Sequence, residues 1–218
     1  MVPTGRFVSP RPRPRPHPRP YRLGRRQAAV DRTRARILRA ARALLVAPRG
    51  VAFSIDAVAR RARVTRATVY QRFGSRPKLL EALFDDLARR GGMWDLADAF
   101  RQPDPGEALA RFVATFGRFW TAHRPIHQRL LALGALDPEF GRTLRARQEW
   151  RRQGLREIVR RLRARGGERS AETSDKTIDV LFALTSFHTF DTLAGPDRTP
   201  SDVVPEVLRL ARSVVGLA

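Results

Sequence analysis

The chain contains no cysteine, so neither disulfide bonds nor thiolate metal sites can form. No apolar run approaches the roughly 18 residues that a membrane-spanning helix needs. The N-terminal stretch is rich in proline and arginine and lacks the apolar segment of a secretory signal. These absences predict a soluble, cytoplasmic protein that makes no contact with membranes.

Lysine is scarce as well. Among 43 basic residues only Lys78 and Lys176 are lysines, and the formal net charge is +22. Such a charge favours binding to polyanions, nucleic acids among them. Arginine content also follows genomic base composition, so the arginine count alone does not identify a DNA-binding protein.

Residues 1–26 differ in composition from the rest of the chain. Between residues 11 and 20 proline alternates with cationic residues, and the whole segment has no acidic residue. Proline fixes φ and removes a backbone donor, which opposes both helix and strand. We therefore predict that residues 1–26 form a disordered tail with polyproline-II character. A basic arm that follows DNA phosphates and an inert tail both fit this composition.

Beyond the tail the chain shows helical patterns and no convincing strand. A first helix is expected over residues 32–46, with Asp31 as its N-cap and Pro48-Arg49-Gly50 as its stop. Further helices are expected from the caps and apolar periodicity at these ranges: 75–90, 104–122, 125–136, 137–165, 177–193 and 199–215. The sequence therefore predicts an all-α protein, long enough for two packed domains.

Residues 54–73 carry two short helical patterns joined by a tight connection. The first pattern has an apolar stripe on one face: Ile55, Val58, Ala59 and Ala62. The second has Val69 and Phe73 on its buried side, and Thr65 stands where its N-cap belongs. This arrangement predicts a helix-turn-helix.

The second helix directs small, polar and basic side chains away from its apolar stripe. They are Arg66, Thr68, Tyr70, Gln71 and Arg72. A short helix with such a surface fits the major groove of DNA, where side chains can reach base edges. Double-stranded DNA is therefore the expected partner.

The run from Ile37 to Phe84 resembles the DNA-binding domain of the TetR family of transcriptional regulators. The steps that a generic helix-turn-helix would not predict are the tyrosine at 70, the phenylalanine at 73 and the following Ser75-Arg76-x-x-Leu79-Leu80. The chain departs from the family in having Arg72 where histidine is common, and in its long proline- and arginine-rich tail.

The resemblance implies a set of DNA-contacting residues: Ser54, Thr65, Arg66, Ala67, Thr68, Tyr70, Gln71 and Arg76. In it, Tyr70 and Arg76 match residues that contact the phosphate backbone. Gln71 lies on the exposed face, and its amide can pair with adenine in the major groove. Structural roles stay open, since Ser54 and Thr65 would cap helices in any protein.

Composition marks off the tail at 1–26. For the rest of the chain the resemblance implies a helix-turn-helix domain at 27–75 and a helical ligand-binding and dimerisation domain at 76–218. It implies a repressor that a small-molecule inducer releases from a palindromic operator, with no cofactor and no catalytic activity. The expected helices at 177–193 and 199–215 are apolar around most of their circumference, which favours a homodimer formed by these two helices. A self-sufficient core is the alternative.

Candidate ligand-binding residues are aromatic or polar groups of the second domain: Trp94, Phe116, Trp120, His123, Phe187 and His188. An aromatic stripe of this kind is more often part of a packed core than the lining of a pocket. His123 and His127 are four residues apart, but Pro125 lies between them and no cysteine is near, so no metal site is expected. His188 and Asp191 are expected either in the pocket or, with slight preference, at the dimer interface.

Other functional classes receive less support. A sequence-tolerant architectural protein would also use the basic tail and the many arginines, and competition with random duplex would separate it from a regulator. No nucleophile–base pair, glycine-rich phosphate loop or metal cluster appears in the sequence. We therefore expect a regulator and not an enzyme.

Overall fold

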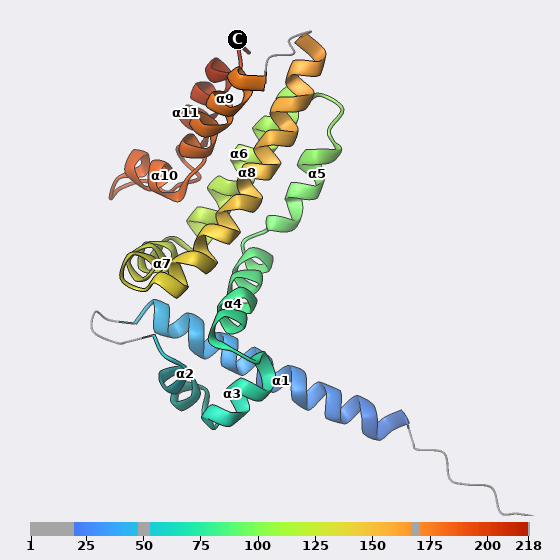
Figure 1. Ribbon diagram of the computed structural model, residues 1–218, viewed down its shortest axis with the longest axis vertical. Coiled ribbons are helices and arrows are strands. Elements are labelled where there is room, and N and C mark those ends of the chain that lie inside the picture. Colours follow the sequence, from blue (N-terminus) through green and yellow to red (C-terminus); the bar gives the residue numbers. More distant parts are fainter. Residues whose placement is uncertain (1–19, 48–52, 167–170, 218) are drawn as a thin grey trace, which may run out of the picture. The chain divides into compact units, whose positions relative to one another are not determined.

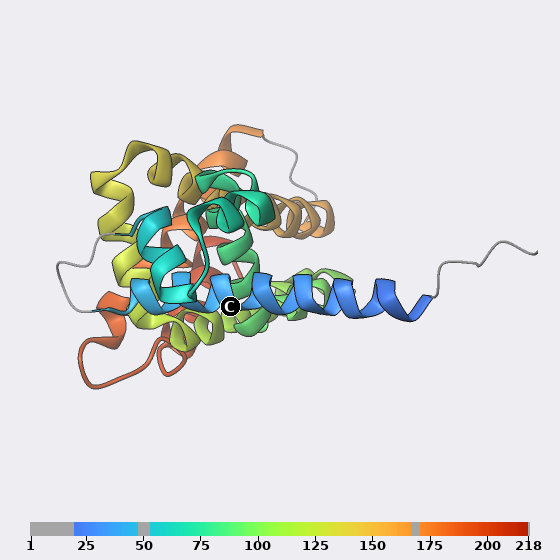
Figure 2. The same ribbon diagram turned by 90° about the horizontal axis from the view of Figure 1, so that it is seen from below.

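The computed structural model describes residues 20–47, 53–166 and 171–217. Within them the regular elements are helices and no strand occurs (Figure 1 and Figure 2). The predicted all-α class is therefore confirmed. The chain divides into two compact units, residues 1–35 and residues 36–218.

The first unit contributes the N-terminal part of α1 (Pro20–Leu45). The helix begins at Pro20 and not near Arg32, so the expectation of disorder was wrong for residues 20–26. Proline is tolerated in the first turn of a helix, and the residues that follow it are mostly arginine, alanine, glutamine and leucine, which favour helix. Asp31 was expected as a cap but lies inside the helix, where it accepts a hydrogen bond from Gln27 (3.1 Å). Residues 1–19 of the expected tail and the Pro48-Arg49-Gly50 stop lie outside the described residues.

In the second unit, the end of α1 packs with α2 (Ile55–Ala62), α3 (Arg66–Phe73) and α4 (Arg76–Arg90). The apolar stripes predicted from the sequence form this core: Ile37, Ala41, Leu45, Val58, Val69, Leu79, Leu83 and Leu87 are almost fully buried. Asp86 of α4 is also buried, and an ion pair with Arg42 (3.1 Å) ties α4 to α1. The helix-turn-helix is therefore stabilised by an apolar core that it forms with α1 and α4.

Three capping hydrogen bonds define where the short helices begin. The hydroxyl of Ser54 accepts from the Ala57 amide (3.1 Å), that of Thr65 from the Thr68 amide (3.1 Å) and that of Ser75 from the Lys78 amide (3.3 Å). Each bond satisfies a backbone donor that the first turn would leave unpaired. The N-caps predicted at Ser54, Thr65 and Ser75 are confirmed.

The remaining helices follow Gly91 and Gly92, where α4 ends as expected. They are η1 (Met93–Asp95), α5 (Leu96–Arg101), α6 (Pro105–Ala122), α7 (Arg124–Leu136), α8 (Pro138–Gly166), α9 (Ala171–Leu184), α10 (Phe187–Ala194) and α11 (Val204–Val214). Helix α6 packs against α5, α8 and α11 (Figure 1). Among the described helices, none combines the length and apolarity needed to cross a bilayer.

A single helix over residues 177–193 was expected, and this prediction was wrong. The chain forms α9 and α10 with a break at Thr185-Ser186. Ser186 caps α10 by accepting from the Thr189 amide (3.2 Å), while Trp120 Nε1 donates to the Thr185 carbonyl (3.2 Å). A local hydroxyl and a distant indole thus satisfy backbone groups that a continuous helix would satisfy itself.

Arg151 of α8 also forms hydrogen bonds at the break between α9 and α10. It donates to the Phe182 carbonyl (2.5 Å) and to the Thr185 hydroxyl (2.7 Å), and its guanidinium lies 3.9 Å from the centre of the Phe182 ring. Burial lowers the pKa of Arg151 to about 9. The carbonyl at the end of a helix and the aromatic face partly replace the water that this charge has lost.

Candidate nucleic-acid interface

Helix α3 presents one side to the core and the other to solvent. Val69 and Phe73 are buried, while Arg66, Ala67 and Gln71 are exposed and Tyr70 is 38% exposed. Thr65 is exposed and Ser54 and Thr68 are half-buried at the same helix starts. The fold therefore brings seven of the eight predicted DNA-contacting residues to the α2–α3 unit, with the side chains of α3 outward.

Arg66 is held in place by a small network on this surface. Its Nη1 donates to Asp56 Oδ2 of α2 (2.8 Å), and its Nη2 donates to the Tyr70 hydroxyl (3.3 Å). The guanidinium lies 5.5 Å from the centre of the Tyr70 ring. The network orients a cation and a phenol together, which limits the conformational entropy lost on binding DNA.

The hydroxyl of Thr65 is already used within the protein. Besides capping α3, it forms a hydrogen bond with the hydroxyl of Thr68 (2.8 Å). The structural role that the sequence left open is therefore present. A DNA contact by Thr65 stays a prediction.

Arg76 is the exception among the predicted residues. It was expected to be available to a DNA phosphate, but its Nη2 pairs with Asp137 (2.5 Å) and its Nη1 with Glu139 (2.8 Å). The side chain is only 24% exposed. In this conformation Arg76 therefore joins α4 to the start of α8, a contact between residues far apart in the sequence that local pattern cannot reveal.

Lys78 is a cation that the sequence reasoning did not assign to the site. It is exposed in the first turn of α4, and a Cβ built on Gly74 would lie 3.6 Å from its Cδ. The side chain therefore runs along the turn between α3 and α4, close to the helix that faces outward. Its scarcity offered a signal, since it is one of only two lysines in the chain.

Four of the six predicted ligand-binding residues lie together around α6 and α7. Phe116, Trp120, His123 and Phe187 are buried, and His127 lies among them with its ring 4.5 Å from that of Trp120 and 5.3 Å from that of Phe187. We call these five residues the aromatic cluster. The rings contact one another closely, so the cluster is packed as a core.

Trp94, His188 and Asp191 do not join the aromatic cluster. Trp94 is 73% exposed and His188 is exposed on α10, so the structure gives no support to a ligand-binding role for either. Asp191, for which a role at the dimer interface was favoured, pairs with Arg124 of the same chain (2.6 Å). These side chains could not be placed from helical spacing because solvent exposure depends on which distant helix covers them.

Both histidines of the aromatic cluster have a lowered pKa. Burial lowers the pKa of His123, whose Nε2 lies 2.9 Å from the Leu87 carbonyl. Burial, followed by the nearby His123, lowers the pKa of His127 to about 3, and its Nε2 has no hydrogen-bond partner. Among the described residues no three histidines, aspartates or glutamates lie close enough to hold a metal ion.

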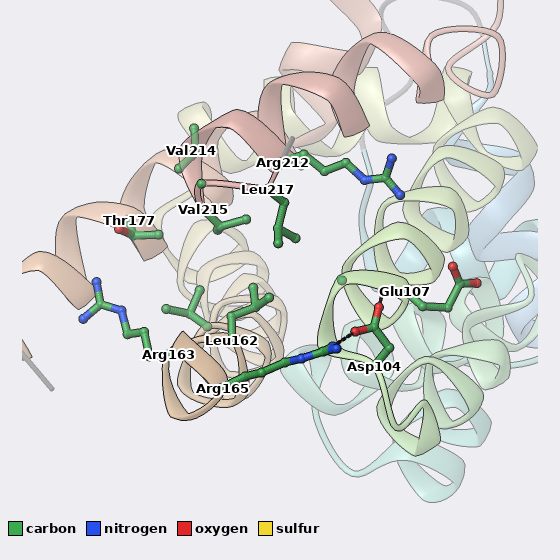
Figure 3. A pocket seen from close by; sticks show the side chains of 13 residues that line it. Asp104, Glu107, Leu162, Arg163, Arg165, Thr177, Arg212, Val214, Val215 and Leu217 are labelled. Atoms are coloured by element: carbon green, nitrogen blue, oxygen red, sulfur yellow. Dashed lines mark hydrogen bonds and ion pairs between the residues drawn. The ribbon is translucent and has the colours of Figure 1, made fainter. Parts of the chain in front are cut away.

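A cavity of about 800 Å³ lies at another place, between the start of α6, the end of α8, α9 and the end of α11 (Figure 3). Its apolar lining is formed by Val159, Leu162, Val214, Val215 and Leu217. Arg163, Arg165 and Arg212 add positive charge, and Arg165 pairs with Asp104. The volume is within the range of small-molecule sites. Sequence reasoning missed it because four separate helices supply its walls.

The helix-turn-helix and the polar outer surface of α3 are features of a DNA-binding domain. Residues 37–83 match the family model of "Bacterial regulatory proteins, tetR family". Residues 37–83 therefore form a DNA-binding domain of the TetR family, and the chain is a DNA-binding transcriptional regulator. No curated protein matches it.

Solved structures show the same fold. PfmR, a TetR family transcriptional regulator from Thermus thermophilus, is 21% identical with a TM-score of 0.59, over 84% of this chain and 98% of that one. GusR from Salmonella enterica is 18% identical with a TM-score of 0.59, over 85% and 96%. A transcriptional regulator from Rhodococcus sp. Rha1 is 17% identical with a TM-score of 0.58, over 84% and 94%.

Proposed function

We propose that this regulator is a repressor that binds a palindromic operator as a homodimer and leaves it when a small molecule binds the second domain. The main observation that supports DNA recognition is the outer surface of α3. Gln71 and Ala67 are exposed on it, and Arg66 and Tyr70 are oriented by mutual contacts. Such a helix can enter the major groove and read base edges.

The dimer is proposed on the character of α9 and α11. The two helices pack against each other and leave apolar side chains partly open to solvent: Val180 is 45% exposed, and Leu184, Leu208 and Leu210 are half-buried. A second copy related by a two-fold axis would cover them. Sedimentation at micromolar concentration tests this, and a monomer there would contradict it.

Release by a ligand is proposed on thermodynamic grounds. A ligand lowers DNA affinity only if it binds the DNA-incompetent conformation more tightly than the competent one. The cavity at the ends of α6, α8 and α11 offers space, with an apolar lining and a basic rim. The aromatic cluster offers little space without rearrangement, so we place the ligand in the cavity.

Selection of bound fragments from a random duplex pool tests the DNA-binding function. We expect a palindromic sequence whose half-sites are spaced by about one helical turn or a multiple of it. The selected duplex should hold the protein against an excess of random duplex. Equal affinity for every duplex would instead favour a sequence-tolerant architectural protein.

A further inference from the structure

The turn from α7 into α8 reaches the core of the DNA-binding helices. We call residues 137–140 the α7–α8 corner. Phe140 is fully buried, and its ring makes edge-on contacts with Phe53, just before α2 (6.1 Å), and with Phe84 of α4 (6.4 Å). The corner is thus part of the apolar support of the helix-turn-helix.

The same corner holds Arg76, a predicted DNA-contacting residue whose guanidinium is engaged in two ion pairs within the protein. The carboxylates of Asp137 and Glu139 each accept a hydrogen bond from one of the two terminal nitrogens of Arg76. Asp137 is itself fixed, because its Oδ1 accepts from the amides of Glu139 and Phe140 (3.1 Å each) at the start of α8. The Arg76 guanidinium also holds the pKa of Asp137 below its ordinary value. Asp137 is therefore held in position by two backbone amides as well as by its ion pair with Arg76.

Helices α7 and α8 are in close backbone contact near Gly134 and Gly141. They approach so closely that a Cβ on Gly141 would lie 2.7 Å from the Gly134 carbonyl oxygen. Helix α7 also carries His127 and Leu130 into the buried core of the second domain. A rearrangement in that core which displaces α7 would therefore displace the α7–α8 corner as well.

A guanidinium binds a phosphate and a pair of carboxylates with the same fork of donors, so one occupant excludes the other. The carboxylates also repel an approaching phosphate. We propose that Arg76 is a positioning switch: Asp137 and Glu139 compete with an operator phosphate for its guanidinium, and the α7–α8 corner thereby sets the affinity for DNA. This inference rests on the proposed DNA-binding function and names how the second domain regulates it.

The test is a double-mutant cycle on the full-length protein with its selected duplex. One arm is the double variant Asp137→Asn and Glu139→Gln. Asparagine keeps the capping oxygen that α8 needs while it removes the charge. We expect at least about fivefold tighter binding. The log–log salt slope should become steeper by about 0.9, because one further phosphate contact forms.

The second arm places the same two substitutions in an Arg76→Ala background, where they should no longer change the affinity. A matched control carries Glu81→Gln and Asp98→Asn, which also remove two negative charges but leave Arg76 and the α4–α8 ion pair between Asp85 and Arg147 intact. The control accounts for the general gain in affinity from a lower negative charge. Circular dichroism verifies that each variant folds, and Glu139→Gln alone should act in the same direction with a smaller effect.

If the double variant gains no more affinity than the control, or gains it equally without Arg76, then Arg76 is a static structural contact and the proposal is wrong. Failure of the proposed function looks different. In that case the wild-type protein shows no preferred duplex in the selection, whatever its salt slope. If the protein has a preferred duplex but the double-mutant cycle shows no coupling to Arg76, the proposed switch is wrong and the DNA-binding function stands.

Discussion

The DNA-binding helices and the second domain are held together in different ways. The starts of α2, α3 and α4 are each set by a hydroxyl that binds an amide three residues further along the chain. The second domain has N-caps as well, at Asp104 and Ser186, but it also depends on contacts that join distant positions, such as Trp120 to Thr185 and Arg124 to Asp191. The first kind of contact can be predicted from residues that are close in sequence, whereas the second forms only when the helices pack.

The largest expected effect concerns the α7–α8 corner, where the two regions meet. Phe140→Ala should lower the free energy of unfolding by about 3–5 kcal/mol, because it leaves a cavity between Phe53 and Phe84. Urea denaturation measures this. Trp150→Ala, at a 69% exposed position of α8, is the matched control and should change the stability by no more than about 0.5 kcal/mol. If Phe140→Ala lowers the free energy of unfolding by no more than the control does, the α7–α8 corner is not part of the core.

The second prediction tests the aromatic cluster through pH. The pKa of His127 is about 3 when folded and near 6.5 when unfolded, so the unfolded chain binds a proton first as the pH falls. Stability from this residue is therefore complete above pH ~6.5 and is lost below it, with a slope of up to about 1.4 kcal/mol per pH unit. His127→Phe should flatten the pH dependence of urea denaturation between roughly pH 4.5 and 6.5. His123, whose pKa is also lowered, should keep part of the slope. An unchanged slope in the variant would mean that His127 is not buried in the folded protein.

The third prediction concerns base recognition by α3. Gln71→Ala should reduce discrimination at one base pair of the selected duplex by about 1–3 kcal/mol, because the amide that pairs with the base edge is lost. Fluorescence anisotropy with singly substituted duplexes measures the effect. Gln153→Ala, at an exposed position of α8, serves as the control. Equal loss of affinity for all duplexes would assign Gln71 to the backbone instead.

The smallest effect is expected at Tyr70. Tyr70→Phe removes the hydroxyl that receives Arg66 and is expected to contact a phosphate. Binding should weaken by about 0.5–1.5 kcal/mol on every duplex alike, with no change in sequence preference. A change in preference would show that the Arg66–Tyr70 network orients a base-reading group.

Much of the DNA-binding region could be predicted from the sequence because its signals are short in range. Apolar spacing identified the buried stripes of α2 and α3, and Ser54, Thr65 and Ser75 marked the starts of helices correctly. Two expectations of helix boundaries failed, one at the start of α1 and one in the second domain. The start of α1 depends on weak propensities that outweighed the proximity of the proline-rich segment, and the break at Thr185-Ser186 depends on donors from α6 and α8.

The sequence by itself determined the helical class, the N-caps and the polar face of the second short helix, since each depends on residues within one or two turns of each other. Only the tertiary structure decided that Arg76 pairs with two carboxylates more than sixty positions away, that Trp94 and His188 lie in solvent and that a cavity opens at the ends of α6, α8 and α11. The physical reason is that ion pairs, exposure and empty space depend on which helices become neighbours, and no local spacing specifies that choice.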